Sequence, residues 1–327
     1  MSARTRIAAI VIAAATGVAL TGCAAPASTT EGLSIVASTN VYGDIAATIA
    51  GDLATVTSII DSAAQDPHSY EASAQDQLAI AGADLVVENG GGYDPFIDVL
   101  VEGSGTSAVV VSAAAVAGLD GDAHSNGEAH SDGDAHSDDE AKAEDDGHGH
   151  IAGVNEHVWY DLHVMGDVAA AISAALVELD AANAATFEAN LAAFQADLEA
   201  VEEAAHTLAD ELGGGAVATT EPVPAYLLAE LGFVDETPAE FVEAIEEGAD
   251  VPPLALQQTL DLIASGDLRL LAYNEQTASP ETERVGAAAE AAGIPVVSFV
   301  ETLPDGEDYV SWMRANIEAV AQALTPA

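Results

Sequence analysis

Histidine and carboxylate side chains are the residues of this sequence whose types and spacing could do chemistry. The chain has one cysteine, Cys23, so a metal site in its body would use imidazole nitrogens and carboxylate oxygens. Four candidates each come just after an expected strand, where ligands gather in open α/β sheets. They are His68, His157, Glu221 and Glu301. Taken singly, each also fits a surface or capping role.

The elements that must position these residues alternate between short β-branched runs and helical patterns. We expect strands at residues 34–38, 54–60, 83–88, 109–111, 216–219, 268–273 and 295–300. Helical patterns lie between most of them. This alternation predicts an α/β fold of two lobes, each a mainly parallel sheet flanked by helices.

A long helical connector is expected between the lobes. Residues 184–212 would extend ~40 Å as one helix, and an apolar stripe recurs along them at spacings of three and four. The connector covers residues 166–212, between an N-terminal lobe at 34–165 and a C-terminal lobe at 213–327. The long helix would bridge the lobes as a rigid spine.

A histidine-rich acidic segment interrupts the N-terminal lobe at residues 120–150. Three six-residue repeats, Gly-Asp/Glu-Ala-His-Ser-Asn/Asp, are followed by His-Gly-His. The segment has no apolar face, so it is expected to be a disordered loop. Its imidazoles would collect a metal loosely, although a solvated acidic linker is the alternative. They are His124, His130, His136, His148 and His150.

The N-terminus is typical of an exported lipoprotein. Arg4 and Arg6 precede an apolar stretch at residues 7–20 that is short for a membrane span. Leu-Thr-Gly-Cys then ends at Cys23, the expected site of lipidation. Residues 1–22 would be the signal peptide and 23–33 a flexible tether. We therefore expect an extracytoplasmic protein anchored to the cell membrane.

The charge balance is strongly acidic, with 55 Asp and Glu residues against 6 Lys and Arg residues. Such a field repels nucleic acid and anionic lipid and attracts cations. Solubility in a salty or acidic habitat explains the charge equally well. The charge therefore argues against nucleic-acid binding but does not identify a ligand.

The sequence resembles the cluster A-I metal-binding receptors, the zinc/manganese-type solute-binding family. Five segments occur in the family's order. They are Val-Ala-Ser-Thr-Asn-Val-Tyr (36–42), Asp-Pro-His-Ser-Tyr-Glu (66–71), Ala-Asp-Leu-Val-Val-Glu-Asn-Gly (83–90), Glu-His-Val-Trp (156–159) and Ala-Gly-Ile-Pro-Val (292–296). The resemblance implies two lobes bridged by one rigid helix, and a protein that is not an enzyme. It also implies a monomer that serves the permease of an ABC importer.

The resemblance also implies a metal held between the lobes by two ligands from each. Carried over to this sequence, the N-terminal ligands are His68 and His157, and the C-terminal ligands are Glu221 and Glu301. Glu301 stands where the family usually has Asp, and two prolines follow Glu221 where the family has a small-aromatic turn. Asp305 and Glu275 are the reserve candidates for these two positions.

The expected cargo is Zn²⁺ or Mn²⁺, with zinc narrowly favoured. Two carboxylates suit Mn²⁺, whereas the histidine-rich loop and the general affinity order favour Zn²⁺. Two other functions stay open: a surface metal buffer or adhesin without a transporter, and a metallohydrolase. Four protein ligands argue against the hydrolase, because catalytic zinc keeps an open position for water.

Overall fold

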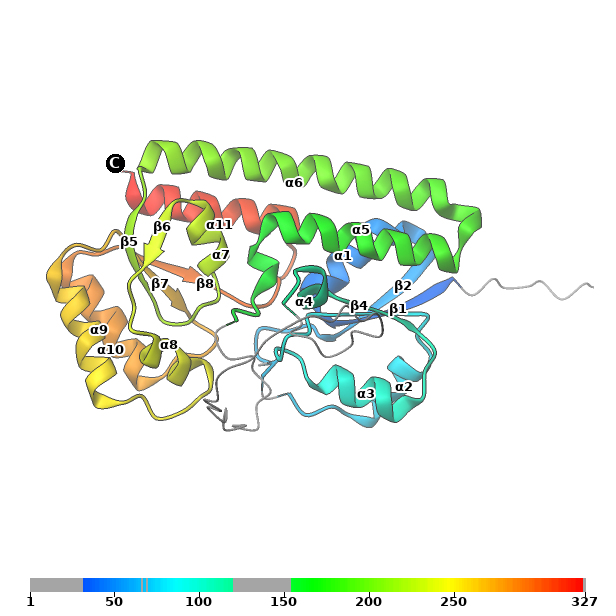
Figure 1. Cartoon of the computed structure of the whole chain (residues 1–327), viewed down its shortest axis with the longest axis horizontal. Coiled ribbons are helices and arrows are strands. Elements are labelled where there is room, and N and C mark those ends of the chain that lie inside the picture. The colour runs from blue at the N-terminus through cyan, green and yellow to red at the C-terminus, as the bar shows by residue number, and fades with distance from the viewer. Residues whose placement is uncertain (1–31, 66, 69, 120–153, 326–327) are drawn as a thin grey trace, which may run out of the picture. The chain divides into compact units, whose positions relative to one another are not determined.

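The computed structural model describes residues 32–65, 67–68, 70–119 and 154–325 (Figure 1). The signal peptide, Cys23 and nearly all of the tether lie outside these residues. The five histidines of the expected loop lie outside them as well.

The N-terminal lobe contains a four-stranded parallel sheet in the order β2-β1-β3-β4. Its strands are β1 (Leu33–Thr39), β2 (Ala54–Ile60), β3 (Leu85–Glu88) and β4 (Val109–Ser112). Its helices are α1 (Asn40–Ala50), α2 (Ala74–Ala81), α3 (Phe96–Ser104) and α4 (Ala113–Val116), with a 3-10 turn at Gly51–Leu53. β3 is buried along its whole length because helices cover both faces of the sheet.

The C-terminal lobe repeats this topology in the order β6-β5-β7-β8. Its strands are β5 (Gly215–Thr219), β6 (Phe233–Asp235), β7 (Leu271–Asn274) and β8 (Val296–Phe299). Its helices are α7 (Ala225–Glu230), α8 (Ala239–Glu246), α9 (Pro253–Ser265), α10 (Pro280–Ala292) and α11 (Tyr309–Leu324). The sequence analysis missed the short edge strand β6, which has only three residues.

Two helices form the connector, α5 (Leu162–Leu179) and α6 (Ala184–Leu212), joined by a 3-10 turn at Ala181–Asn183. α6 runs beside α5 at one end and beside α11 at the other (Figure 1). α5 is long and apolar enough to cross a membrane by length and composition. Its buried side chains, among them Met165, Ile172 and Leu176, pack into the main core, as expected for a core helix.

The main hydrophobic core is continuous between the lobes. One cluster joins Ile35 and Val87 of the first sheet, Phe194 and Leu198 of α6, and Val297 of the second sheet. Each sheet buries its other face in a separate cluster. Because the lobes share one packed core, closing or opening them as rigid bodies would disrupt it. Small local motions are the motions that this packing allows.

Candidate metal centre

The four predicted ligands lie after the carboxyl ends of strands or in the turn that begins at residue 154. His68 follows β2, and His157 precedes a 3-10 turn at Val158–Tyr160. Glu221 and Glu301 each come two residues after a strand, β5 and β8 respectively. Parallel strands bring these ends to one edge of each sheet, which is where ligands of open α/β sheets collect.

Three of the four predicted ligands come together. One ring nitrogen each from His68 and His157 and one oxygen of Glu301 lie within 4.8 Å of one another. We call these three residues the inner group. Ligand atoms of a tetrahedral zinc ion, at bond lengths of 2.0–2.2 Å, are about 3.4 Å apart. The inner group therefore needs side-chain shifts of only about 1 Å to enclose an ion.

His157 is fixed in one orientation by its surroundings. Its Nδ1 lies 2.7 Å from Oδ1 of Asn155, an oxygen that only accepts hydrogen bonds. Nδ1 therefore carries the proton, and Nε2 keeps the lone pair that binds a metal. The ring of Trp159 packs 5.1 Å away, and the imidazole is 1% exposed. Burial and the amide partner preorganise this ligand.

Asn155 also ties the histidine turn to the C-terminal lobe. Its Nδ2 donates to the carbonyl of Pro222 at 3.1 Å, and its own carbonyl accepts from Tyr226 at 2.7 Å. Pro222 is the residue after Glu221. The turn that carries one imidazole is thus hydrogen-bonded to the turn that carries a carboxylate of the other lobe.

Asn274, at the end of β7, holds the two C-terminal carboxylates. Its Nδ2 donates to Oε1 of Glu301 at 2.8 Å and to Oε2 of Glu221. Glu221 is 4% exposed but is not one of the three residues of the inner group. The side-chain amide of Asn274 therefore holds both Glu221 and Glu301, and Glu221 lies next to the inner group without being part of it. The reserve candidates Asp305 and Glu275 are both exposed and belong to neither ligand group among the described residues.

Tyr93 contacts the inner group from the N-terminal lobe. Its hydroxyl donates to Oε2 of Glu301 at 3.2 Å, and its ring meets His68 edge-on at 4.9 Å between centroids. Burial, reinforced by the charge of Glu301, raises the pKa of Tyr93 well above its usual value. Tyr93 is therefore a neutral hydrogen-bond donor. It fixes one oxygen of Glu301 and adds no negative charge to the site.

The loop before Tyr93 has a backbone that requires glycine. Gly90, Gly91 and Gly92 have φ values of 71°, 67° and 98°, in the left-handed region. The carboxylate of Asp94 accepts from the N–H groups of Asn89 at 2.7 Å and Gly90 at 2.8 Å. Burial raises the pKa of Asp94 to about 6, although these hydrogen bonds oppose the shift. The loop and this carboxylate together place Tyr93.

A second ligand group adjoins the first. Glu156, His157 and Glu246 also bring one ligand atom each within 4.8 Å of one another. Glu246 is the last residue of α8, and its Oε1 lies 3.7 Å from Nδ1 of His157. Burial and the carboxylates of Glu156, Glu221, Glu301 and Glu247 raise the pKa of Glu246 to about 9. We call Glu156, His157 and Glu246 the outer group.

Sequence reasoning missed Tyr93, Asn274 and Glu246 as parts of the site. The triple glycine before Tyr93 and the strand end at Asn274 were visible in the sequence, but neither residue type is a preferred metal ligand. Glu246 stands in a run of acidic residues on a short helix, where an exposed face is the usual reading. Only the packing of α8 against the histidine turn distinguishes it.

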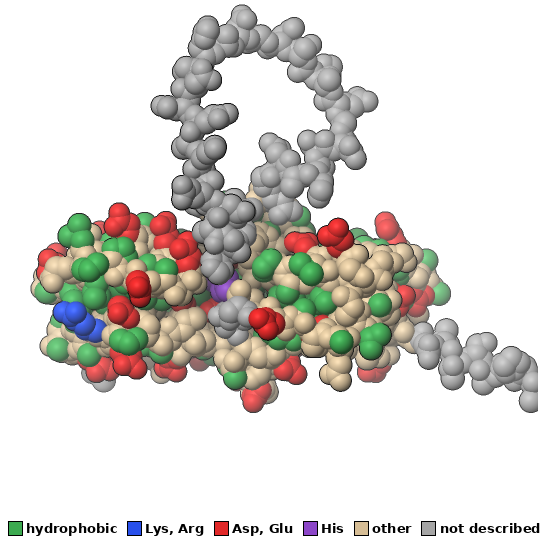
Figure 2. Space-filling view, turned by 90° about the horizontal axis from the view of Figure 1, so that it is seen from below, with side chains coloured by type: hydrophobic (Ala, Val, Ile, Leu, Met, Phe, Trp, Pro, Cys, Tyr) green, Lys and Arg blue, Asp and Glu red, His purple; other side chains and the backbone are tan. Residues whose placement is uncertain are grey.

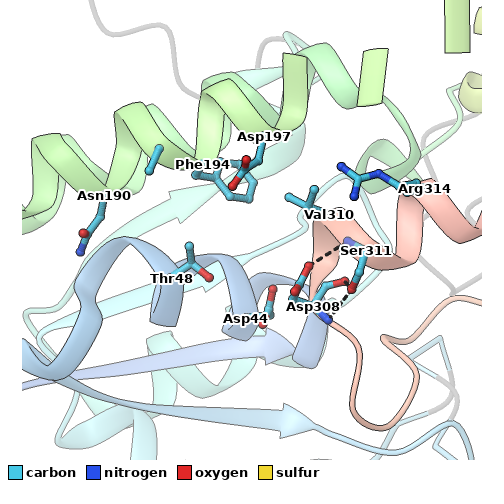
Figure 3. Close-up of a pocket in the computed structure, with 10 residues that line it drawn as sticks. Asp44, Thr48, Asn190, Phe194, Asp197, Asp308, Val310, Ser311 and Arg314 are labelled. Carbon is cyan, nitrogen blue, oxygen red and sulfur yellow. Dashed lines mark hydrogen bonds between the residues drawn. The ribbon is translucent and has the colours of Figure 1, made fainter. Parts of the chain in front are cut away.

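Another cavity lies away from these histidines, among α1, α6 and α11 (Figure 3). Its volume is about 390 Å³, and its wall contains Asp44, Asp197, Asp308 and Arg314. Asp308 is occupied in capping α11, where its carboxylate accepts from the Ser311 N–H at 2.8 Å. The wall includes no histidine and neither of the two ligand groups. Ligand chemistry therefore points to the histidine site and not to this cavity.

Two α/β lobes on a rigid helical connector, with imidazoles and carboxylates converging from both lobes, define a solute-binding protein for a metal ion. The chain belongs to the family described as zinc-uptake complex component A, periplasmic, which it matches over residues 35–323. Its members are extracytoplasmic metal-binding components of zinc and manganese uptake, not enzymes.

One relative is similar in sequence, and two solved structures are similar in fold. The manganese-binding lipoprotein MntA of Halalkalibacterium halodurans is 38% identical over 80 residues, which is 24% of this chain and 26% of that protein. The periplasmic zinc-binding protein TroA of Treponema pallidum has a TM-score of 0.68 at 17% identity, over 89% of this chain and 99% of that one. The laminin-binding protein Lmb of Streptococcus agalactiae has a TM-score of 0.68 at 20% identity, over 90% of this chain and 100% of that one.

Proposed function

We propose that this protein captures a divalent transition metal between its lobes and delivers it to the permease of an ABC importer. His68, His157 and Glu301 are its proposed ligands, and Glu221 is the proposed fourth. The convergence of the inner group from three separate segments carries this proposal. Each of these three donors suits zinc or manganese, and no cysteine competes with them in the body of the chain.

Glu221 reaches the ion by exchanging partners. Its carboxylate is bonded to Asn274, which also holds Glu301. When an ion occupies the inner group, its charge replaces the amide as the partner of Glu221. Because the shared core limits motion between the lobes, we infer that this exchange comes from rotation about the side-chain bonds of Glu221.

Zinc is the proposed cargo, by a narrow margin over manganese. The family is described by zinc uptake, and a site of this kind binds Zn²⁺ more tightly than Mn²⁺. The histidines at 124, 130, 136, 148 and 150 would add a zinc-collecting segment. Against this, the relative with 38% identity is described as manganese-binding. Competition between the two ions is therefore part of the test.

We also propose a monomer that is tethered to the membrane through a lipid on Cys23, after removal of residues 1–22. The Leu-Thr-Gly-Cys sequence supports the lipid, and the relative with 38% identity is described as a lipoprotein. Residues 23–33 would link the membrane to the lobes. Leu33, the last of them, is already the first residue of β1.

A surface adhesin is the second candidate, because Lmb of Streptococcus agalactiae is described as both an adhesin and a metal transporter. An adhesin of this type can also bind metal, so metal binding alone does not separate the two functions. Metal-limited growth of a strain that lacks the protein does separate them. A strain whose growth is rescued by added Zn²⁺ or Mn²⁺ supports transport, and growth that does not depend on metal contradicts it.

Competition titration of the purified protein with Zn²⁺ and Mn²⁺ tests the site itself. We expect one tight equivalent in the wild type, weakened more than 100-fold in His68→Ala, because even residues behind a ligand cost 10–100-fold. His163→Ala removes an exposed histidine outside both groups and is the matched control. A variant without residues 120–150 should keep the tight equivalent. Tight binding that survives His68→Ala and disappears with residues 120–150 would overturn the proposed site and indicate a metal buffer.

A further inference from the structure

The carboxylate of Glu246 is poorly satisfied for a buried group. Its side chain is 14% exposed, and its Oε1 is shielded from solvent and has no hydrogen-bond partner among the described residues. Its contact with Nδ1 of His157 is 3.7 Å, too long for a hydrogen bond, and Asn155 already takes that N–H at 2.7 Å. A buried carboxyl oxygen without a hydrogen-bond partner is costly. A cation next to it would remove that cost.

Among the described residues, the charged groups that act on Glu246 are all carboxylates. The carboxylates that act on it are those of Glu156, Glu221, Glu301 and Glu247. Glu156 is 2% exposed and adjoins His157 in the sequence. The last turn of α8 therefore adds a carboxyl group to a region of carboxylates, and such a negative region attracts and concentrates divalent cations.

Glu246 also shares a cavity with His68 of the inner group. A cavity of about 500 Å³ has both His68 and Glu246 in its wall, together with Glu247, Gln276, Thr277 and Glu281. It lies between α8 and the start of α10. On the face of the molecule shown in Figure 2, a histidine side chain reaches the surface near the middle, between the two lobes. An ion that enters this cavity meets Glu246 and His68 before it is enclosed.

We propose that Glu246 is the residue that first receives the metal ion and, with Glu156, holds it in the outer group before the ion passes to the inner group. The proposal rests on the proposed function. Both groups contain His157, so the two positions adjoin each other at this residue. Two divalent ions in adjoining positions would repel each other strongly. The outer and inner groups are therefore filled one after the other. Glu246 thereby sets the rate of loading more than the final affinity.

Stopped-flow mixing with ZnCl2, and separately with MnCl2, tests this role. The indole of Trp159 packs against His157 and reports the arrival of the ion through its fluorescence. The test variant is Glu246→Gln, which keeps the shape of the side chain and replaces the carboxyl group, which can bind a metal ion, with an amide. The control is Glu247→Gln, the same change on an exposed residue in the wall of the same cavity.

We expect Glu246→Gln to lower the association rate constant well beyond twofold, because an amide cannot give up a proton and bind the arriving ion as a carboxyl group does. The dissociation rate constant should fall by a similar factor, because the ion leaves by the same path. Glu247→Gln should change both rate constants less than twofold. An association rate constant in Glu246→Gln within twofold of wild type overturns the proposal, as does an equal loss in both variants.

These outcomes are distinct from failure of the proposed function. If the wild-type protein shows no tight equivalent, or if His68→Ala binds as tightly as the wild type, the metal site itself is wrong. If the wild type binds tightly, His68→Ala does not, and Glu246→Gln loads at the normal rate, the site stands and only the role of Glu246 is wrong.

Discussion

Tyr93 of the N-terminal lobe donates a hydrogen bond to Glu301 of the C-terminal lobe, with 3.2 Å between Oη and Oε2. The bond crosses the boundary between the lobes at the proposed metal site. It fixes one oxygen of the carboxylate, while Asn274 fixes the other at 2.8 Å. The conformation of this ligand is therefore set by both lobes at once.

Replacing Tyr93 with phenylalanine should weaken metal binding about 10-fold. Loss of a partner behind a ligand typically costs 10–100-fold in affinity, and the ring contact with His68 is kept in this variant. Isothermal titration with Zn²⁺ measures the change. Tyr273→Phe is the control, because its hydroxyl meets Thr282 and neither ligand group. Equal affinities in Tyr93→Phe and Tyr273→Phe would show that the bond across the lobes does not position Glu301.

Asn274→Asp should destabilise the metal-free protein by about 3 kcal/mol. The change removes the donor shared by Glu221 and Glu301 and adds an unpaired charge beside them. Urea unfolding in the presence of a chelator measures the loss. Asn190→Asp is the control, because Asn190 makes one bond to the carbonyl of Ile49, at 3.0 Å, and is only partly buried. Asn190→Asp should lower the free energy of unfolding by about 1 kcal/mol. A smaller loss in Asn274→Asp than in this control contradicts the bridging role.

Removing the metal should lower the stability of the wild-type protein but not that of Glu301→Gln. A ligand at 100 times its Kd stabilises the folded state by about 2.7 kcal/mol. Glu301→Gln keeps the shape of the side chain while weakening the metal contact. Thermal unfolding with and without chelator compares the two proteins. A metal-induced rise in Tm of Glu301→Gln equal to that of the wild type would remove Glu301 from the ligand set.

The stability of the metal-free protein should fall between pH 4 and pH 6 through Asp94. The pKa of this buried carboxyl is raised from 3.8 to about 6, so the folded state holds its proton where the unfolded state has lost it. The resulting contribution to the free energy of unfolding is complete below pH 3.8 and is lost as the pH rises to about 6. Its size is about 3 kcal/mol.

Urea unfolding at several pH values, in wild type and Asp94→Asn, isolates this contribution. The asparagine variant cannot titrate, so the difference in free energy of unfolding between the two proteins should change by about 3 kcal/mol across the window. The wild type should lose stability relative to the variant as the pH rises. A difference that stays constant from pH 4 to pH 6 would mean that Asp94 titrates normally.

The sequence alone determined the fold class and the ligand types. Alternating β-branched runs and helical stripes predict two parallel α/β lobes, because strand and helix periods differ and can be read locally. The spine was predictable for the same reason, since the apolar stripe of α6 recurs over its whole length. The lone Cys23 also restricted the ligands in the body of the chain to histidine and carboxylate.

Tertiary structure decided which of these residues meet. His68 and Glu301 follow strands of two different sheets, His157 comes from the turn before Val158, and no local pattern contains the convergence of these three segments. The lobes share one topology without a sequence repeat, so their correspondence was hidden in the sequence. Asn274 and Glu246 join the site through contacts with residues distant in the chain. Hydrogen bonds and burial of this kind depend on packing between elements, and packing is fixed only when the whole core is assembled.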